Sequence, residues 1–212
     1  KVGFIGGTKI PPVERFGIGF VQGAKAAKSD IKVMYNYSGT FSDTNKGKTL
    51  AATMYDSGAD VIFVAAGNTG NGVISEAKER GIIDMSKSGE IKHWVVGVDK
   101  DQYEEGIFKG KDKDGKEYQK SAILTSAVKN IEVAVTKILN EIKEGKFTKG
   151  EHIFGIKENG VGIPKENPNL SEEAKTKIAK AVEELKSGKA EVVATGDELK
   201  AKGVATNIEG EL

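Results

Sequence analysis

Two aspartates and a lysine follow apolar runs of the sequence, where they could bind the hydroxyl groups of a ligand. Asp99 and Asp101 come directly after the run Trp94–Val98. Lys129 comes soon after the run Ala122–Thr125. A carboxylate can accept hydrogen bonds from two vicinal hydroxyls, as sugar recognition requires, and Lys129 could pair with Asp99 or donate to the same hydroxyls. A metal-binding Asp-x-Asp pair or a helix cap remains possible for the aspartates, and a solvated side chain for the lysine.

A glycine-rich segment from Gly67 to Gly72 could bring backbone N–H groups close to a ligand. It follows the apolar run Val61–Ala66 and precedes a helical pattern, which is typical of a strand-to-helix turn. Such turns bind ligands because the first N–H groups of a helix have no partner within it. Gly67 and Asn68 are the candidate contacts, and a flexible turn without a ligand is the alternative.

Two stretches resemble nucleotide and metal motifs but fail at a required position. From Ser42 to Thr49 the sequence resembles a phosphate-binding loop, but Ser42 replaces the glycine that lets such a loop turn. The stretch around Asp112 resembles a calcium loop, but Gly110 and Ser121 stand where its first ligand and its glutamate belong. The sequence has no cysteine and two histidines, so we expect no metal site and no cofactor.

Charge and hydropathy narrow the classes of function further. There are 32 basic and 31 acidic residues, which gives a formal net charge of +1 and argues against nucleic acid as a partner. The longest apolar run, Val61–Ala66, is far shorter than the ~20 residues of a membrane-spanning helix. We therefore expect neither a nucleic-acid partner nor a helix that crosses a membrane.

Strand and helix patterns alternate along the first part of the chain. The expected strands are Lys1–Gly6, Ile31–Tyr37, Val61–Ala66, Trp94–Val98 and Ala122–Thr125, and the expected helices are Val13–Lys28, Thr44–Ser57 and Val73–Arg80. This alternation predicts an α/β fold with a doubly wound parallel sheet covered on both faces. Gly58 and Gly81 are expected to cap helices. The carboxyl ends of the strands gather ligands in such sheets, so Asp99, Lys129 and Gly67 are expected to meet there.

The remainder of the chain is patterned differently. Asp114-Gly115 within Gly106–Lys120 predicts an exposed β-hairpin. Ser171 is expected to cap a second helix of this part. The expected elements are helices Asn130–Glu144 and Glu172–Lys186, a short strand His152–Lys157, a loop or tight turn Gly160–Pro164, and a weakly patterned tail from Gly196.

Several short stretches, in this order, resemble the basic membrane protein family, the bacterial substrate-binding lipoproteins of ABC importers that include purine nucleoside receptors. Each stretch is short, but together they cover the chain from Lys1 to about Gly162. They are Lys1–Gly7 with Pro11 and Phe16, Gly19-Phe20, Phe41–Asp43 with Lys46–Lys48, Met54–Asp60, Ala65–Gly67 with Thr69-Gly70, Gly97–Gln102, Leu124–Ser126 with Lys129, and Gly160–Gly162.

The resemblance implies a type I periplasmic-binding fold, in which two lobes close on a purine nucleoside and no chemistry follows. It implies that Asp99 holds the ribose hydroxyls, that Lys129 assists, and that Gly67 and Asn68 approach the ligand. Phe41 is a candidate for stacking on the base. The implied partners are the nucleoside and a membrane permease of the ABC importer, and the implied location is extracytoplasmic, with a lipid anchor on the cell membrane.

Compared with the family pattern, most of a first lobe and the lipid-bearing segment would be expected before Lys1. We therefore expect residues 1–124 to form a complete second lobe, and residues 125–212 to form the hinge crossover and return segment of an incomplete first lobe. The amphipathic helices after Asn130 would then expose apolar surface and promote self-association. The hairpin Gly106–Lys120 is longer than the family pattern leads us to expect.

Two other classes of function remain open. The first is an enzyme that acts on a sugar or nucleoside through Asp99, Asp101 and a metal, although no convincing base or nucleophile accompanies them. The second is the ligand-sensing domain of a regulator with this fold, because a fold does not determine a function.

Overall fold

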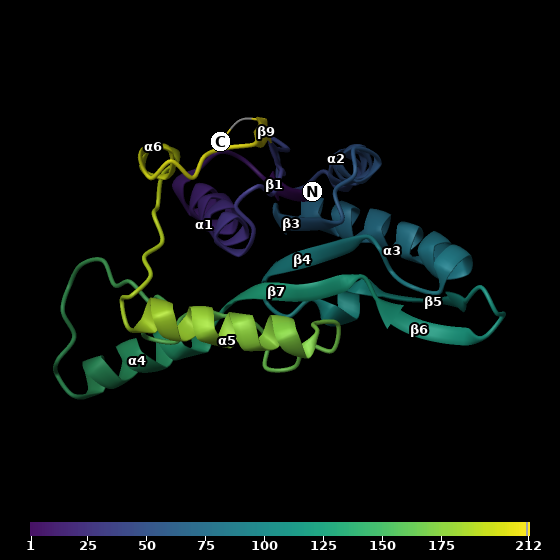
Figure 1. The fold of residues 1–212 in the computed structure, drawn as a ribbon. Helices are drawn as coiled ribbons and strands as arrows, with labels where there is room; N and C mark the ends of the chain where they lie inside the picture. The colour runs from purple at the N-terminus through teal and green to yellow at the C-terminus, as the bar shows by residue number, and fades with distance from the viewer. Residues whose placement is uncertain (211) are drawn as a thin grey trace.

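A parallel sheet organises the computed structural model, which describes residues 1–210 and 212 (Figure 1). Within these residues, seven strands pair in the order β8-β7-β4-β3-β1-β2-β9, and a separate two-stranded hairpin, β5-β6, lies beside them. The strands of the main sheet are β1 (Val2–Gly6), β2 (Val33–Tyr37), β3 (Val61–Ala65), β4 (Trp94–Asp99), β7 (Ile123–Lys129), β8 (Val161–Gly162) and β9 (Ile208–Gly210). Only the short β8 runs antiparallel to its neighbour among the pairs of this sheet that are described.

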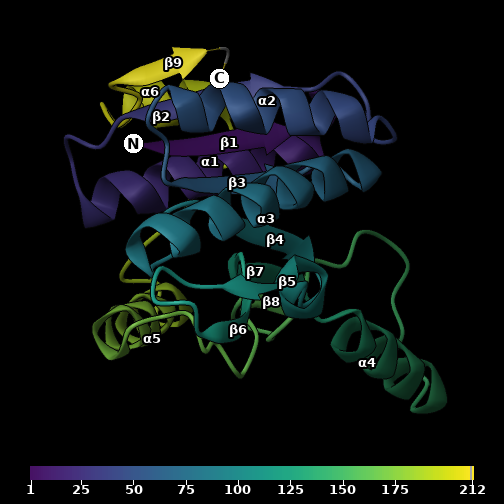
Figure 2. The same ribbon diagram turned by 90° about the vertical axis from the view of Figure 1, so that its right-hand side faces the viewer.

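Helices cover both faces of this sheet (Figures 1 and 2). The helices α2 and α3 lie on one face, and α1 and α6 lie on the other. The helical elements are α1 (Pro11–Ala27), α2 (Thr44–Asp56), α3 (Asn68–Ser88), the 3-10 turn η1 (Tyr103–Gly106), α4 (Ile131–Lys143), α5 (Glu172–Lys186) and α6 (Gly196–Ala201). The predicted α/β fold with a mainly parallel, doubly wound sheet is confirmed.

Each face of the sheet has its own apolar core because successive residues of a strand point to opposite sides. On β1, Phe4 packs with the apolar residues of α1 and with Leu199 of α6. Its neighbour Ile5 packs with residues of α2 and α3 on the other face. Both side chains are fully buried. This alternation fixes the strand register, and with it the edge at which the carboxyl ends of the parallel strands collect.

Pro11 and Pro12 precede the expected helix Val13–Lys28 and occupy the first two positions of α1, where a missing N–H group costs little. Two local predictions are confirmed. The Ser171 hydroxyl accepts a hydrogen bond from the Ala174 N–H and so caps α5. The hairpin consists of β5 (Ile107–Lys111) and β6 (Glu117–Ser121).

The helix predicted at Val73–Arg80 is much longer than its pattern indicates. It is α3, which begins at Asn68, so the predicted glycine-rich turn is the first turn of a helix. The prediction that Gly81 caps this helix is wrong, because Gly81 lies inside α3, where any side chain would collide with the Phe108 ring. The left-handed cap is Gly89, with a φ of 79°.

Two predictions for the later part of the chain are also wrong. Residues 152–157 form no strand, because the apolar side chains there have no sheet edge to join, and Ile153 is 77% exposed. Residues 161–162, predicted as a loop or tight turn, form the short strand β8 beside β7. The weakly patterned tail contains both α6 and β9, and β9 pairs with β2.

The helices α4 and α5 bury no residue fully within the described part of the chain. On α4, Ile131, Val135, Leu139 and Ile142 are between 51% and 63% exposed. The expected exposure of apolar surface is therefore present, whereas self-association stays a prediction.

The expected boundary between residues 124 and 125 falls inside β7, and β9 and α6 also pack on the main sheet. The division into lobes stays a prediction too. None of the helices described is long and apolar enough to cross a membrane.

Candidate functional site

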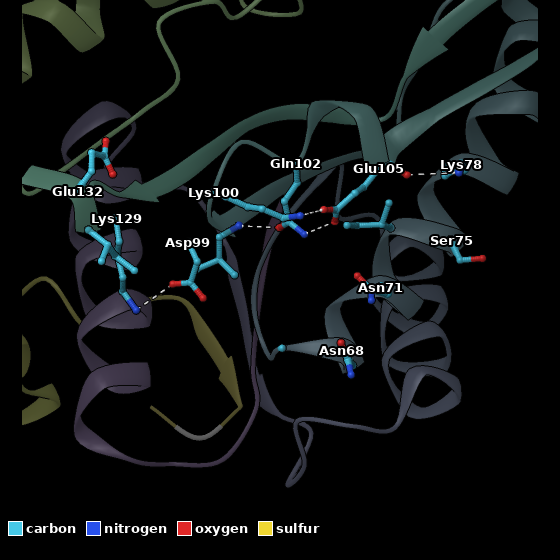
Figure 3. Close-up of a pocket in the computed structure, with 14 residues that line it drawn as sticks. Asn68, Asn71, Ser75, Lys78, Asp99, Lys100, Gln102, Glu105, Lys129 and Glu132 are labelled. Atoms are coloured by element: carbon cyan, nitrogen blue, oxygen red, sulfur yellow. Dashed lines mark hydrogen bonds and ion pairs between the residues drawn. The ribbon is translucent and has the colours of Figure 1, made fainter. Parts of the chain in front are cut away.

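A cavity of about 770 Å³ opens at the carboxyl ends of β4 and β7, beside the start of α3 (Figure 3). This is the edge at which an open parallel sheet collects its ligand-binding groups. The α3 residues along it are Asn68, Asn71, Ile74, Ser75 and Lys78; the others are Gly67, Val98, Asp99, Lys100, Gln102, Glu105, Lys129, Ile131 and Glu132. Four of the five predicted site residues are among them.

Asp99 and Lys129 form an ion pair at this cavity. The Lys129 Nζ lies 2.8 Å from the Asp99 Oδ1. They meet because β4 and β7 are parallel neighbours, with Asp99 paired in register with Val128. The prediction that these two residues lie together is confirmed. Their side chains are 59% and 43% exposed, and such a solvated pair is worth at most about 1 kcal/mol, so both groups can exchange partners with a ligand.

The Lys129 ammonium group also contacts an aromatic ring. The Lys129 Nζ lies 4.9 Å from the centroid of the Phe16 ring, which belongs to α1. Ammonium groups are attracted to the face of an aromatic ring. Phe16 was noticed in the sequence only as part of the family resemblance, since its place in the helical pattern of α1 indicates a packed core position.

The start of α3 forms the opposite wall. Figure 3 shows Asn68, Asn71, Ser75 and Lys78 along one side of this helix, across the cavity from Asp99 and Lys100. The helix begins after Gly67, whose φ of 54° suits glycine. Sequence reasoning found Gly67 and Asn68 but missed the rest. Their helical spacing would have revealed them had the helix been predicted to start at residue 68.

The glycines after Asn68 also have a packing role. A side chain at Gly72 would collide with the Thr44 backbone, and one at Gly47 would collide with the Thr69 backbone. These two positions let α2 and α3 approach each other closely. The glycine content of the turn is therefore partly a requirement of helix packing, while Gly67 and Asn68 remain at the cavity.

Phe41 is the predicted site residue that does not line the cavity. Its ring covers Gly7, where a side chain would collide with it, and its carbonyl oxygen accepts a hydrogen bond from the Thr69 N–H. The Phe41 side chain is 39% exposed. It lies beside Gly67 and is still available for stacking, which stays a prediction.

Asp101 is used by the local backbone rather than by the cavity. Its Oδ1 accepts a hydrogen bond from the Tyr103 N–H at 3.0 Å, next to the start of η1. Asp101 is absent from the cavity lining, so it does not form an Asp-x-Asp pair with Asp99 there. In the described part of the chain, no three histidines or carboxylates are grouped as a metal ion would need.

Charges of both signs line the cavity in equal number. The carboxylates are Asp99, Glu105 and Glu132, and the ammonium groups are Lys78, Lys100 and Lys129. Desolvation raises the pKa of Glu105, but hydrogen bonds from the Lys100 ammonium and the Gln102 amide outweigh it, and the pKa lies below its ordinary value. Because the lining charge sums to zero, the cavity suits a neutral polar ligand better than a phosphate.

Comparison with known proteins places residues 1–195 within a family model described as "ABC transporter substrate-binding protein PnrA-like". The chain is 44% identical over 190 residues to the "ABC transporter nucleoside-binding protein BmpA" of Lactococcus lactis. This alignment covers 89% of this chain and 52% of the relative. It is 36% identical over 165 residues to "Basic membrane protein D" of Borreliella burgdorferi, covering 77% of this chain and 42% of the relative. The chain thus spans about half the length of the curated relatives it matches.

Solved structures share the fold. An ABC transporter solute-binding protein from Aeropyrum pernix superposes with a TM-score of 0.69 at 24% identity, over 96% of this chain and 62% of that one. A transcriptional activator of the comK gene from Bacillus halodurans superposes with a TM-score of 0.68 at 22% identity, over 89% and 57%. At these identities the likeness concerns the fold alone.

Proposed function

The chain belongs to the Bmp family of PnrA-like ABC transporter substrate-binding proteins, and from this we propose that it captures a purine nucleoside for import. The observation that carries the proposal is the Asp99–Lys129 pair, exposed at the carboxyl ends of two parallel strands and facing Asn68 across a cavity. The Lactococcus lactis relative is named as a nucleoside-binding protein, which supports the same class of ligand.

In the bound state, the 2′ and 3′ hydroxyls of the ribose donate to the Asp99 carboxylate. Lys129 holds Oδ1, and among the described residues none donates a hydrogen bond to Oδ2, so this oxygen is available to the first hydroxyl. The Lys129 ammonium donates to a hydroxyl oxygen in turn. Such charge-assisted hydrogen bonds are short and directional, so they select a cis-diol over a single hydroxyl.

The two sides of the cavity have separate tasks. Asn68 and the N–H groups at the start of α3 bind acceptor atoms of the ligand, because the helix dipole makes this end positive. Phe41, beside Gly67, stacks on the base. The balanced lining charge favours a nucleoside over a nucleotide, because three carboxylates offset the three ammonium groups that would attract a phosphate.

Capture without chemistry is the favoured mode of action. The Lactococcus lactis relative is named for nucleoside binding, and the family model is one of substrate-binding proteins. Asp101 is held by the Tyr103 N–H and does not line the cavity, so an Asp99–Asp101 pair is not available there to bind a metal or share a proton.

The functional protein is proposed to contain further segments besides this chain, because the chain spans about half the length of its curated relatives. A second lobe closes over the cavity, a lipid anchor holds the protein on the outer side of the cell membrane, and a permease of the ABC importer receives the ligand. Hinge closure of this kind buries the ligand and completes its hydrogen bonds.

A ligand-sensing domain of a regulator is the second candidate. The likeness to a transcriptional activator of Bacillus halodurans favours it, because the same fold serves both roles. The identity to the nucleoside-binding protein of Lactococcus lactis is much higher, at 44%, so transport is preferred. Loss of nucleoside uptake on deletion of the gene supports transport, and altered transcription with unchanged uptake supports a regulator.

A thermal-shift screen of the full-length protein tests the ligand class. Adenosine, guanosine and inosine are compared with free ribose, with the matching 5′-monophosphates and with pyrimidine nucleosides. The expected result is that purine nucleosides raise the melting temperature most and the monophosphates little. A larger shift with the monophosphates, or none with any nucleoside, would refute the proposal.

A further inference from the structure

The backbone turns sharply at Asp99, at the mouth of the cavity. Its φ is 69°, in the left-handed region that aspartate tolerates better than most residues but that still favours glycine. The Lys100 N–H donates to the Val98 carbonyl at 2.9 Å, which closes the turn. A non-glycine residue stays in such a conformation only where its surroundings hold it. The direction of the Asp99 carboxylate therefore depends on what fixes this turn.

The Gln102 side chain holds the turn at Asp99 in place. Its Oε1 accepts the Val98 N–H at 2.8 Å, and its Nε2 donates to the Glu105 Oε2 at 2.6 Å (Figure 3). Its backbone N–H donates to the Ser126 hydroxyl of β7 at 3.1 Å. Both ends of the side-chain amide are thus used inside the protein. Gln102 lines the cavity, and both its amide oxygen and its amide nitrogen already have a partner in the protein.

The neighbouring residues are shaped around this glutamine. A Cβ atom at Gly97 would lie 2.7 Å from the Gln102 Oε1 and 2.7 Å from the Ser126 Oγ, so any larger residue at this position would collide with the Gln102 amide. Ser126 is fully buried. Glu105 is held in turn, since its Oε1 lies 2.6 Å from the Lys100 Nζ and its carbonyl oxygen accepts from the Lys78 Nζ at 3.3 Å. The network joins β4, β7, η1 and α3.

We propose that Gln102 is the positioning residue of this site, which holds the left-handed turn at Asp99 and so aims its carboxylate at the ligand's cis-diol. The inference rests on the proposed function and deepens it. Gln102 acts on selectivity for the two hydroxyls rather than on the base, because its amide oxygen holds the Val98 N–H, next to Asp99.

The test compares adenosine with 2′,3′-dideoxyadenosine, which lacks both hydroxyls, by calorimetric titration of the full-length protein. Gln102→Met keeps the length of the side chain and removes both amide bonds. It should weaken adenosine binding roughly tenfold, the scale of one lost hydrogen bond, and leave dideoxyadenosine binding nearly unchanged. In an Asp99→Ala background the same substitution should have almost no further effect, because the carboxylate it positions is gone.

Two further variants separate positioning from stability. Gln22 of α1 is a matched control, since its Oε1 accepts the Val193 N–H and its Nε2 donates to the Glu191 carbonyl. Gln22→Met should lower the melting temperature without changing the preference for hydroxyls. The exchange Gln102→Glu with Glu105→Gln reverses the donor and the acceptor but retains both bonds, so it should restore the preference.

The outcomes distinguish this inference from the function on which it rests. If Asp99→Ala removes the preference for adenosine but Gln102→Met keeps it, positioning by Gln102 is refuted and nucleoside capture stands. The same holds if Gln22→Met reduces the preference as much as Gln102→Met does. If the unmodified protein does not distinguish the two nucleosides, or if Asp99→Ala is neutral, the placement of the ribose is refuted and this inference with it.

Discussion

Removing the Asp99 carboxylate is the most direct test of the site. Asp99 lines the cavity and Lys129 occupies its Oδ1, so under the proposed function Asp99→Ala deletes one hydroxyl contact outright and a second that is shared with the lysine. A hydrogen bond to a charged group contributes about 1.5–3 kcal/mol. The Asp99–Lys129 ion pair that the free protein loses changes this figure little, because an exposed pair contributes at most about 1 kcal/mol.

The expected loss of nucleoside affinity is therefore about 1.5–3 kcal/mol, or roughly 10- to 150-fold. Asp99→Asn keeps the acceptor and tolerates the left-handed backbone, so it should lose less affinity than Asp99→Ala. Calorimetric titration with adenosine, 2′-deoxyadenosine and 2′,3′-dideoxyadenosine measures each step. In Asp99→Ala, the affinities for all three ligands should converge on the affinity of the wild-type protein for the dideoxy ligand.

Stability controls the interpretation of this result. Asp99 is exposed and its ion pair is solvated, so Asp99→Ala should unfold within a few degrees of the wild-type protein. Equal loss of affinity for all three ligands would show that the carboxylate does not contact the ribose. Unchanged affinity would refute the reasoning from strand ends to ligand altogether.

The other predictions concern stability and assembly. Because its folded pKa is lowered, Glu105 stabilises the protein above its unfolded pKa of about 4.3 and loses this contribution as the pH falls through the folded value, so urea unfolding from pH 6 to 3 should be less pH-dependent in Glu105→Gln. Gly72→Ala should destabilise by about 1–3 kcal/mol through collision with the α2 backbone, whereas Gly23→Ala, on α1 with open space around it, should stabilise by up to about 1 kcal/mol; chemical unfolding measures both. Glutamate at Val135 and Leu139 should reduce self-association of the chain in sedimentation, and a sedimentation coefficient that is monomeric before and after substitution would contradict this.

Strand and helix periods predicted the central part of the fold well. Five parallel strands and the helices α1 and α2 were recognisable because each has its apolar residues at the spacing of its own element. The hairpin was recognisable from the turn signal Asp114-Gly115. The start of α3 was not, since Asn68 to Gly72 has the composition of a loop and becomes helical only by packing against α2. β9 was missed as well, because a three-residue strand has no period of its own and forms by pairing with β2.

Part of the site could be predicted, because the strand patterns show where two of its residues lie. Asp99 and Lys129 could be brought together from sequence because both follow strands of one parallel sheet. Gln102 could not be recognised, since its role depends on one backbone N–H group and one carboxylate that the fold brings within reach. Phe16 lies under Lys129 only because α1 crosses that part of the sheet, which no local pattern indicates.

For the proposed capture of a nucleoside, the contact between Lys129 and the Phe16 ring has a consequence for release. Without a ligand, the Lys129 Nζ lies 4.9 Å from the centroid of the Phe16 ring and 2.8 Å from the Asp99 Oδ1. A nucleoside that binds Asp99 would compete with Lys129 for the carboxylate, while the Phe16 ring would still give the ammonium group a neighbour. Under this proposal, the competition would limit the affinity for the nucleoside, and the return of Lys129 to Asp99 would favour its release.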